Sequence, residues 1–312
     1  MFKFITRRVI QLIPILFGVI TVTFLIMYII PGDPVLSLVG ERYDEATIEK
    51  MREEFGLDKP LPLQYADYIG RVARLDFGRS FMTGRPVIES IKEYFPRTLV
   101  LAFTSMLIAV AAGVVIGAVS SLKRFRWLGR GLMTFSLVGV SIPVFWLGLL
   151  LIYLFAIKLS LLPPSGYGNG SLRYLILPAV TLSFASMATV ARVSRSSFLD
   201  ISSEEFIKTA RAKGLNEFVV FAKHLVRNAL IPVITIVGTD FGSYLGGSVL
   251  TESIFGWPGL GRHIVQAILK RDFPVIQGAV LFMALLFVLV NLLVDLSYGF
   301  IDPRVRVEGK RG

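Results

Sequence analysis

Six long apolar runs, separated by charged segments, dominate the pattern of this chain. They lie at about residues 9–30, 98–122, 132–157, 174–194, 229–250 and 279–301. Each run is long enough for a helix to cross a hydrocarbon core that is about 30 Å thick. Pro178, Arg192 and three serines interrupt the fourth run, but proline and small polar residues are tolerated where neighbouring helices satisfy the backbone. The pattern predicts an all-α membrane protein with six transmembrane helices.

A segment of 66 residues, 31–96, separates the first two runs on the side that we expect to be extracytoplasmic. Residues 44–57 and 59–78 within it predict two helices, because their apolar residues recur at helical spacing. This spacing favours a small folded cap over a plain linker. On the same side we expect a turn-rich loop at 158–173 and, at 251–278, an irregular FGWPGLG loop followed by the short helix HIVQAILK.

A charged insert, residues 202–232, lies between the fourth and fifth runs. Ser202 and Glu205 fit the S-x-x-E capping box that begins a helix. Gly214 is a natural residue to end that helix, since it reaches positive φ without strain. Asn216 then predicts the cap of a second helix. A protein that only crossed the bilayer would need no such pair of helices.

The first helix of the charged insert is predicted to be amphipathic. Phe206, Ile207 and Ala210 share one broad apolar face. The basic residues around this face are Lys208, Arg211 and Lys213. Two interpretations stay open on this evidence, a docking site for a soluble partner and a helix lying on an anionic membrane surface.

Lys and Arg residues concentrate on one side of the predicted membrane. If both termini are cytoplasmic, the inner segments carry 18 Lys/Arg and six Asp/Glu, whereas the rest of the chain carries 15 and 16. The net charge of +11 therefore lies on the inner side, as the positive-inside rule predicts. The loop KRFRWLGR, residues 123–130, has four cations and no acid. Nucleic-acid binding is not indicated, because no basic stripe is interleaved with aromatic residues.

The sequence argues against an enzyme. It has no cysteine, and its two histidines, His224 and His263, are far apart in the predicted topology, so no metal site is expected. It contains no G-x-x-x-x-G-K-[ST] pattern, which would form the backbone cradle for nucleotide phosphates. No nucleophile–base pair lies at membrane depth. The cationic start, followed by a long apolar run without a cleavage site, predicts a retained first helix.

Five segments together resemble the first permease of dipeptide and oligopeptide ABC importers, in the peptide/nickel branch. They are RRVIQLIPILFGVITVTFLIMYIIPGDP (7–34), ARAKG (210–214), RNALIPVIT (227–235), FGWPGLGRHIVQAILKRDFPVIQG (255–278) and DLSYGFIDPRVR (295–306). The resemblance implies a type I importer fold in a bacterial or archaeal cytoplasmic membrane. It also implies four kinds of partner: a second homologous permease, two cytoplasmic ATPases, an extracytoplasmic substrate-binding protein and the lipid bilayer.

The resemblance implies that this chain forms half of a pathway for short peptides and binds no cofactor itself. ATP and Mg²⁺ are expected on the ATPase subunits. Nickel chelates, glutathione and oligosaccharides are alternative substrates within the family. An ion-coupled secondary transporter is the alternative from another class, but Asp240 is its one deep ionisable candidate and no internal repeat is visible.

On this interpretation the chain has four parts. Residues 1–30 hold the cytoplasmic N-terminus and first helix, and 31–96 form the extracytoplasmic loop. The transmembrane domain follows at 97–302, with a cytoplasmic coupling loop at about 200–228. A cytoplasmic tail, 303–312, ends the chain.

The charged insert resembles the coupling helix that docks on the ATPase in such importers. The implied contact residues are Glu205, Lys208, Thr209, Ala210, Arg211 and Gly214. The general permease pattern, E-A-A followed three residues later by G, falls on Lys208, Thr209, Ala210 and Gly214, so lysine stands where glutamate is usual. Any ion pair that depends on that glutamate is therefore in doubt.

Small and charged residues inside the predicted spans have two interpretations each. Gly238, Gly242 and Gly246 recur every four residues, as do Gly113 and Gly117, and such spacing suits either close helix packing or a pathway wall.

Asp240 lies in the middle of the fifth span. A charge there is costly, so it either faces the pathway, together with Gly242 and Gly246, or makes a structural hydrogen bond.

The outer loop that matches the family contains Trp257, Pro258 and Arg262. An aromatic residue and an arginine at a wet rim suit recognition of the binding protein. Anchoring of the tryptophan at the membrane interface is the alternative.

Overall fold

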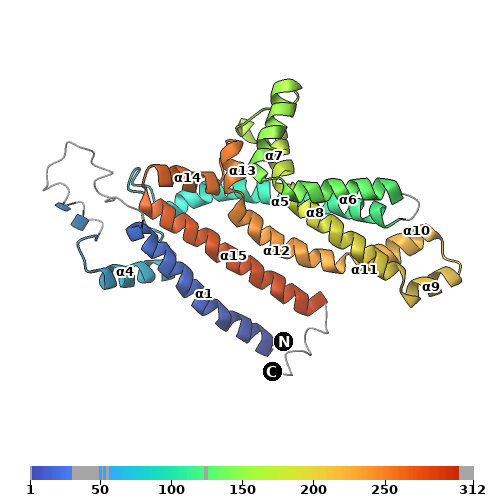
Figure 1. Cartoon of the computed structure of the whole chain (residues 1–312). Coiled ribbons are helices and arrows are strands. Elements are labelled where there is room, and N and C mark those ends of the chain that lie inside the picture. The colour runs from blue at the N-terminus through green and yellow to red at the C-terminus, as the bar shows by residue number, and fades with distance from the viewer. Residues whose placement is uncertain (1, 30–48, 51, 54–55, 123–125, 302–312) are drawn as a thin grey trace. The chain divides into compact units, whose positions relative to one another are not determined.

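The computed structural model describes residues 2–29, 49–50, 52–53, 56–122 and 126–301 (Figure 1). Within these ranges the regular elements are helices, together with one isolated antiparallel bridge between Arg79 and Pro86. They form two compact units. The first, which we name the insert unit, comprises Leu99–Trp257 and the chain from Leu289; the second, the α1 unit, comprises Phe2–Thr98 and Pro258–Val288.

The α1 unit is built around its N-terminal helix. Its elements are α1 (Phe2–Ile29), α4 (Leu61–Ala73), α14 (Leu260–Leu269) and the first parts of α5 (Val87–Ser121) and α15 (Phe273–Ile301). One apolar core joins them, and its buried members include Phe24, Tyr68, Val87, Leu260 and Ile276.

Helix α4 packs on α1 through an apolar and hydroxyl-bearing face. The Tyr65 hydroxyl lies 2.6 Å from Thr21 Oγ1, and the Tyr68 hydroxyl lies 3.2 Å from Thr23 Oγ1. The Phe24 ring lies 5.1 Å from Tyr65 and 5.7 Å from Tyr68. The helix predicted at 59–78 is therefore present over Leu61–Ala73 and is folded onto α1, whereas most of the helix predicted at 44–57 lies outside the described residues.

A turn, residues 74–86, joins α4 to α5. Gly78 has φ +80°, a left-handed conformation that glycine adopts without strain. The carboxylate of Asp272, which is 5% exposed, accepts hydrogen bonds from the Ser80 hydroxyl and, at 3.0 Å, from the backbone N–H of Phe81. Residues distant in sequence thus fix this turn at the beginning of α15.

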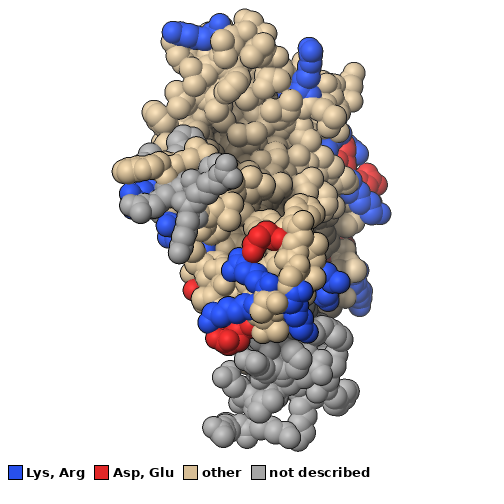
Figure 2. Space-filling view, turned by 90° about the vertical axis from the view of Figure 1, so that its right-hand side faces the viewer, with Lys and Arg blue, Asp and Glu red and all other residues tan. Residues whose placement is uncertain are grey.

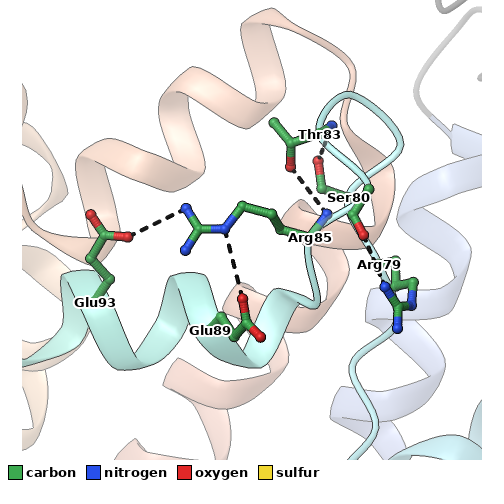
Figure 3. Close-up of polar contacts among 7 residues, drawn as sticks. Arg79, Ser80, Thr83, Arg85, Glu89 and Glu93 are labelled. Atoms are coloured by element: carbon green, nitrogen blue, oxygen red, sulfur yellow. Dashed lines mark hydrogen bonds and ion pairs between the residues drawn. The ribbon is translucent and has the colours of Figure 1, made fainter.

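The first turns of α5 carry exposed ion pairs (Figure 3). Arg85 lies 3.7 Å from Glu89 and 3.6 Å from Glu93. Beside them, the backbone N–H of Thr83 donates to Ser80 Oγ at 3.0 Å. Exposed pairs contribute at most about 1 kcal/mol each, so they orient the turn more than they stabilise it.

Helix α5 begins at Val87, about ten residues before the apolar run from which its span was predicted. The hydropathy pattern finds only the apolar part of a long helix. Its first turns belong to the α1 unit, so α5 begins within the segment 31–96 that was predicted as the extracytoplasmic loop.

The insert unit is organised around α8 (Leu172–Ser202). It is contacted by α6 (Arg126–Ser141), α7 (Val144–Leu151), α12 (Ile231–Gly247) and α13 (Val249–Ile254). Much of α8 is buried, including Pro178 and the three serines that interrupt its apolar run. The fourth predicted span is therefore the central helix of this unit.

The third predicted span, 132–157, is not one continuous helix. α6 ends at Ser141, and α7 begins after Pro143 and continues as a π-helix, Ile152–Lys158. Proline lacks a backbone N–H and disfavours helical backbone at the residue before it. The chain therefore breaks at Pro143 within an uninterrupted apolar run.

Five helical segments of the described part are long and apolar enough to cross a membrane. They lie at Ile10–Ile29, Val87–Ser121, Leu172–Ser202, Glu217–Gly246 and Phe273–Val294, and Val144–Lys158 is a shorter apolar helix. The all-α membrane architecture is confirmed, with the third predicted span supplied by two shorter helices.

Most of the spaced glycines serve close packing within the chain. A Cβ on Gly113 would lie 2.7 Å from Val190 Cγ1, and one on Gly117 would lie 2.5 Å from Ser194 Cβ, both on α8. A Cβ on Gly238 would lie 2.6 Å from Val294 of α15, whereas nothing lies within 4 Å of one on Gly246. Glycine here lets helix backbones approach one another.

Candidate functional site

The charged insert follows the C-terminal end of α8, where the chain reverses direction through a series of short helices (Figure 1). It contains α9 (Glu205–Ala212), α10 (Glu217–Val219), a π-helix (Val220–Val226) and α11 (Arg227–Ala229), which leads into α12. The two helices predicted on either side of Gly214 are therefore present.

The predicted capping box at Ser202 is wrong. α8 extends to Ser202, whose hydroxyl donates backwards to the Leu199 carbonyl at 2.8 Å. The N-cap of α9 is Glu204, and its side chain makes no capping hydrogen bond. A serine near the end of one helix can donate back to a carbonyl of that helix instead of capping the next one. The S-x-x-E spacing is the same in both cases.

The end of α9 is confirmed as a glycine stop. Gly214 has φ +76°. The Leu215 N–H donates to the Ala210 carbonyl at 3.3 Å and the Gly214 N–H to the Arg211 carbonyl at 2.9 Å, which together make a Schellman motif. The Asn216 side chain then accepts from the Phe218 N–H at 2.9 Å, as predicted. The direction of the chain after α9 is therefore fixed by backbone hydrogen bonds.

One face of α9 is buried in a core of its own. Ile207 is 0% and Ala210 6% exposed. They pack with Phe198 of α8 and with apolar residues that follow α9, including Val220 and Ala229. Ala210 was predicted to contact a partner, but it lies beneath α9 because the helix turns this part of its apolar face toward α8. The insert is therefore a folded body rather than a single helix on a surface.

The other predicted contact residues, Glu205, Lys208, Thr209, Arg211 and Gly214, are exposed. Lys208 pairs with Glu205 at 2.7 Å, and Arg211 makes two hydrogen bonds to Glu217, at 2.8 and 3.2 Å. Figure 2, which faces this end of the insert unit, shows basic side chains gathered around fewer acidic ones. The pairs add little stability in water, but they hold the charged groups in fixed positions.

Four exposed apolar residues lie beside these charges, and of these the sequence pattern had indicated Phe206 alone. Phe218 is 75% exposed, and Phe206, Leu215 and Val219 are 42%, 40% and 38% exposed. Three of them follow the glycine stop, outside the periodic pattern of α9, so helix periodicity gave no signal for them. Exposed apolar groups rimmed by charges mark a protein-interaction surface.

The three residues predicted to line a pathway do not share one face of α12. At 100° per residue, Gly242 lies about 200° around the helix from Asp240. Gly242 is buried, whereas Asp240 is partly exposed and Gly246 is exposed. Among the described residues Asp240 has no hydrogen-bond or ion-pair partner, so none of them supplies the structural hydrogen bond that is the alternative to a pathway role.

Trp257 is buried in the insert unit, at 2% exposure. Its ring meets Tyr167 edge-on at 5.0 Å, and the backbone N–H of Trp257 donates to the Glu252 backbone carbonyl at 2.8 Å. It therefore supports the loop from beneath and neither anchors in the membrane interface nor stands at a wet rim. In the α1 unit, the Pro258 carbonyl accepts from Arg97 at 3.5 Å, and Arg262 is partly exposed.

His263 in the α1 unit is poised to respond to pH. Its ring stacks on Tyr94 at 4.2 Å, and its Nε2 is buried without a hydrogen-bond partner. Burial lowers the pKa of His263 below its usual 6.5; Asp272 and Glu93 oppose this shift, and Lys270 adds to it. The stability that the neutral ring contributes is present above pH 6.5 and is lost as the pH falls through the lowered pKa.

We expect the unfolding temperature to fall as the pH is lowered below 6.5, and the His263→Gln variant to lose part of this dependence. Thermal unfolding of the detergent-solubilised protein across this range measures the effect. His224→Gln, in the insert unit, controls for the loss of a histidine. An unchanged pH profile in His263→Gln would contradict the assignment.

In the described part of the chain, no three His, Asp or Glu side chains come together as metal ligands.

Two family profiles match this sequence. Residues 109–307 match the family described as "Binding-protein-dependent transport system inner membrane component". Residues 1–102 match "Binding-prot-dependent transport system membrane comp, N-term".

Curated relatives match nearly the whole chain. A putative peptide transport system permease protein of Brucella abortus is 42% identical over 310 residues, covering 97% of this chain and 99% of the relative. The glutathione transport system permease protein GsiC of Escherichia coli K12 is 44% identical over 306 residues, covering 98% and 99%.

Among solved structures, the crystal structure of an amino acid ABC transporter with histidines matches with a TM-score of 0.52 and 19% identity. The match covers 69% of this chain and 95% of that chain. It supports the fold described above.

Proposed function

Because the chain belongs to the family of binding-protein-dependent transport system inner membrane components, we propose that it is the permease subunit through which an ATP-driven importer moves short peptides. Family membership makes it a membrane permease of an ABC importer. The substrate, the coupling surface and the partners are our proposals. An ion-coupled secondary transporter has no support from these relatives.

The folded charged insert carries this proposal. Its buried core packs α9 and the π-helix Val220–Val226 against α8, so a force applied to α9 reaches a helix that crosses the membrane. Its exposed face offers Phe218 among charges held by the Arg211–Glu217 pair. An aromatic anchor with an ordered polar rim suits docking in a groove of a soluble subunit. We assign that subunit as a cytoplasmic ATPase.

Several further assignments follow from this docking. The insert and both termini lie in the cytoplasm, as the distribution of Lys and Arg favours. ATP and Mg²⁺ bind the two ATPases and not this chain. A homologous second permease completes the pathway, and a substrate-binding protein delivers the substrate from outside. Asp240, which has no hydrogen-bond or ion-pair partner among the described residues, contributes a polar group to that pathway.

Short peptides are the substrate that the relatives favour. The relative from Brucella abortus is a putative peptide transport permease. The relative GsiC is a glutathione permease, and glutathione, itself a small peptide, is the second candidate.

Replacing Phe218 by aspartate is expected to lower ATP-driven peptide uptake at least about tenfold while the protein stays folded in the membrane. Removal of an aromatic anchor typically costs about 2 kcal/mol or more of binding free energy. Uptake into proteoliposomes containing the complete transporter, together with co-purification of the ATPases, measures the effect.

Leu172→Asp is the matched control, because Leu172 is 74% exposed and lies at the opposite end of α8. The control is expected to retain uptake. Normal uptake and normal ATPase co-purification by Phe218→Asp would refute the docking role.

A further inference from the structure

The α1 unit contains a pocket of about 720 Å³ that the transport mechanism above does not use. Its walls come from the C-terminal part of α1, α4, the turn at 76–81, the beginning of α15 and, before α4, from Glu53, Gly56, Leu57 and Lys59. This volume lies in the range of small-molecule sites, about 300–1,000 Å³. The pocket lies entirely within one compact unit.

Helix α4 turns a polar stripe toward the pocket. Gln64, Asp67, Arg71 and Arg74 follow one another at intervals of three and four residues, so they share one side of the helix. The neighbouring stripe, which begins at Tyr65, packs on α1. Phe24 and Phe77 belong to the apolar core and also line the pocket, so its floor is aromatic.

The rim of the pocket is held in place by polar contacts. The Gln64 side-chain amide donates to the Lys59 carbonyl at 2.7 Å and to the Leu57 carbonyl at 3.2 Å. Lys59 in turn pairs with Asp67 at 2.7 Å. The hydrogen bond between them raises the pKa of Lys59 and lowers that of Asp67, so both stay charged. These contacts form the site before any ligand binds.

Three other charges line the pocket and form no ion pair among the described residues, although Arg71 lies close enough to Asp67 to help lower the pKa of that carboxyl. Arg71, Arg74 and Glu53 make no ion pair or side-chain hydrogen bond among the described residues. Two guanidinium groups one turn apart suit a carboxylate, which arginine binds through paired N–H donors. An unpaired glutamate suits an ammonium group. The pocket therefore offers both charge signs above an aromatic floor.

We propose that this pocket binds a short peptide by its two ends, with the C-terminal carboxylate at Arg71 and Arg74 and the N-terminal ammonium at Glu53. Side chains of the peptide then lie over Phe24 and Phe77. The choice of a peptide rests on the function proposed above. A phosphoethanolamine headgroup carries the same pair of charges, and the experiment distinguishes the two sources.

Binding of dialanine to the full chain tests the proposal. The chain is placed in phosphatidylglycerol nanodiscs, without ATPases or binding protein, and the peptide is titrated by calorimetry. We expect saturable binding that Arg71→Ala and Arg74→Ala each weaken about tenfold or more, and that the double variant abolishes. All three variants change exposed side chains, so the fold is retained.

Capped peptides assign each end of the ligand. N-acetyl-dialanine lacks the ammonium, so its binding is expected to be insensitive to Glu53→Gln, which weakens binding of dialanine. Dialanine amide lacks the carboxylate, so its binding is expected to be insensitive to Arg71→Ala. Arg85→Ala is the matched control, because Arg85 is an exposed arginine of the same unit that pairs with Glu89 and Glu93 outside the pocket.

Absence of saturable dialanine binding, or equal binding by the Arg71→Ala/Arg74→Ala variant, overturns the proposal. Binding of glycerophosphoethanolamine in place of dialanine, with the same dependence on these residues, assigns the pocket to lipid and also overturns it. This titration needs no ATPase. A negative result would therefore overturn the peptide site without bearing on the proposed docking of the ATPase. Normal uptake by Phe218→Asp with intact dialanine binding would refute the coupling role alone.

Discussion

Replacing Gly117 by valine is expected to prevent most of the protein from reaching its folded state. The first added carbon would lie 2.5 Å from Ser194 Cβ, 2.7 Å from the Ala191 carbonyl oxygen and 2.9 Å from the Arg195 backbone nitrogen. Two of these atoms are backbone of α8, so no side chain can move aside to make room. Overpacking costs about 1–3 kcal/mol, and we expect the upper end because α5 and α8 must separate.

Thermal stability of the solubilised protein, followed by size-exclusion chromatography, measures this effect. Gly131→Val is the matched control, because Gly131 also lies in a helix, α6, and nothing lies within 4 Å of an added Cβ. Both variants replace a helical glycine by valine, so they share the change in helix propensity. They differ in the room available for the added side chain. Equal stability of the two variants would show that the α5–α8 contact is not closely packed.

Replacing Ala210 by glutamate is expected to unfold the charged insert while leaving the chain in the membrane. Ala210 is 6% exposed and lies among Phe198, Ile207 and Val220. The described residues of that core are apolar, so none of them offers an ion pair to the new carboxylate. An uncompensated buried charge costs about 3–5 kcal/mol, which is large for a segment held by a small core. α9 is therefore expected to detach from α8, and ATP-driven uptake to be lost.

Limited trypsin digestion tests this prediction, because the insert contains Lys208, Arg211 and Lys213 as cleavage sites. Cleavage is expected to be fast in Ala210→Glu and slow in the wild type. Ala212→Glu is the control, since Ala212 is exposed on the same helix. A protease-resistant insert in Ala210→Glu would mean that its core does not depend on this contact.

The features that were predicted correctly in the charged insert are local. A left-handed residue is needed where α9 reverses, and glycine meets that need at Gly214. The Asn216 side chain reaches an N–H only two residues away. The wrong prediction at Ser202 is also local. The Ser202 hydroxyl can either donate to a carbonyl of α8 or cap the start of α9, and both groups lie within a few residues. That choice depends on where α8 ends, and the packing of α8 decides it.

The length and hydropathy of the apolar runs were sufficient to predict the long transmembrane helices. They did not predict where these helices begin or break. Val87–Ser121 was found only in its apolar part, because its first turns carry charges. The break at Pro143 interrupts an apolar run that a hydropathy pattern treats as continuous.

The sequence by itself determined an all-α membrane protein, the positions of its apolar helices and the helix stop in the charged insert. These follow from composition, run length and local backbone preference, which are properties of neighbouring residues. The tertiary structure alone decided that Gly117 is closely packed while Gly246 has open space around it, that Ala210 and Trp257 are buried, and that Arg71 lines a pocket. Each of these depends on atoms from segments distant in the chain, so no periodicity in the sequence records them.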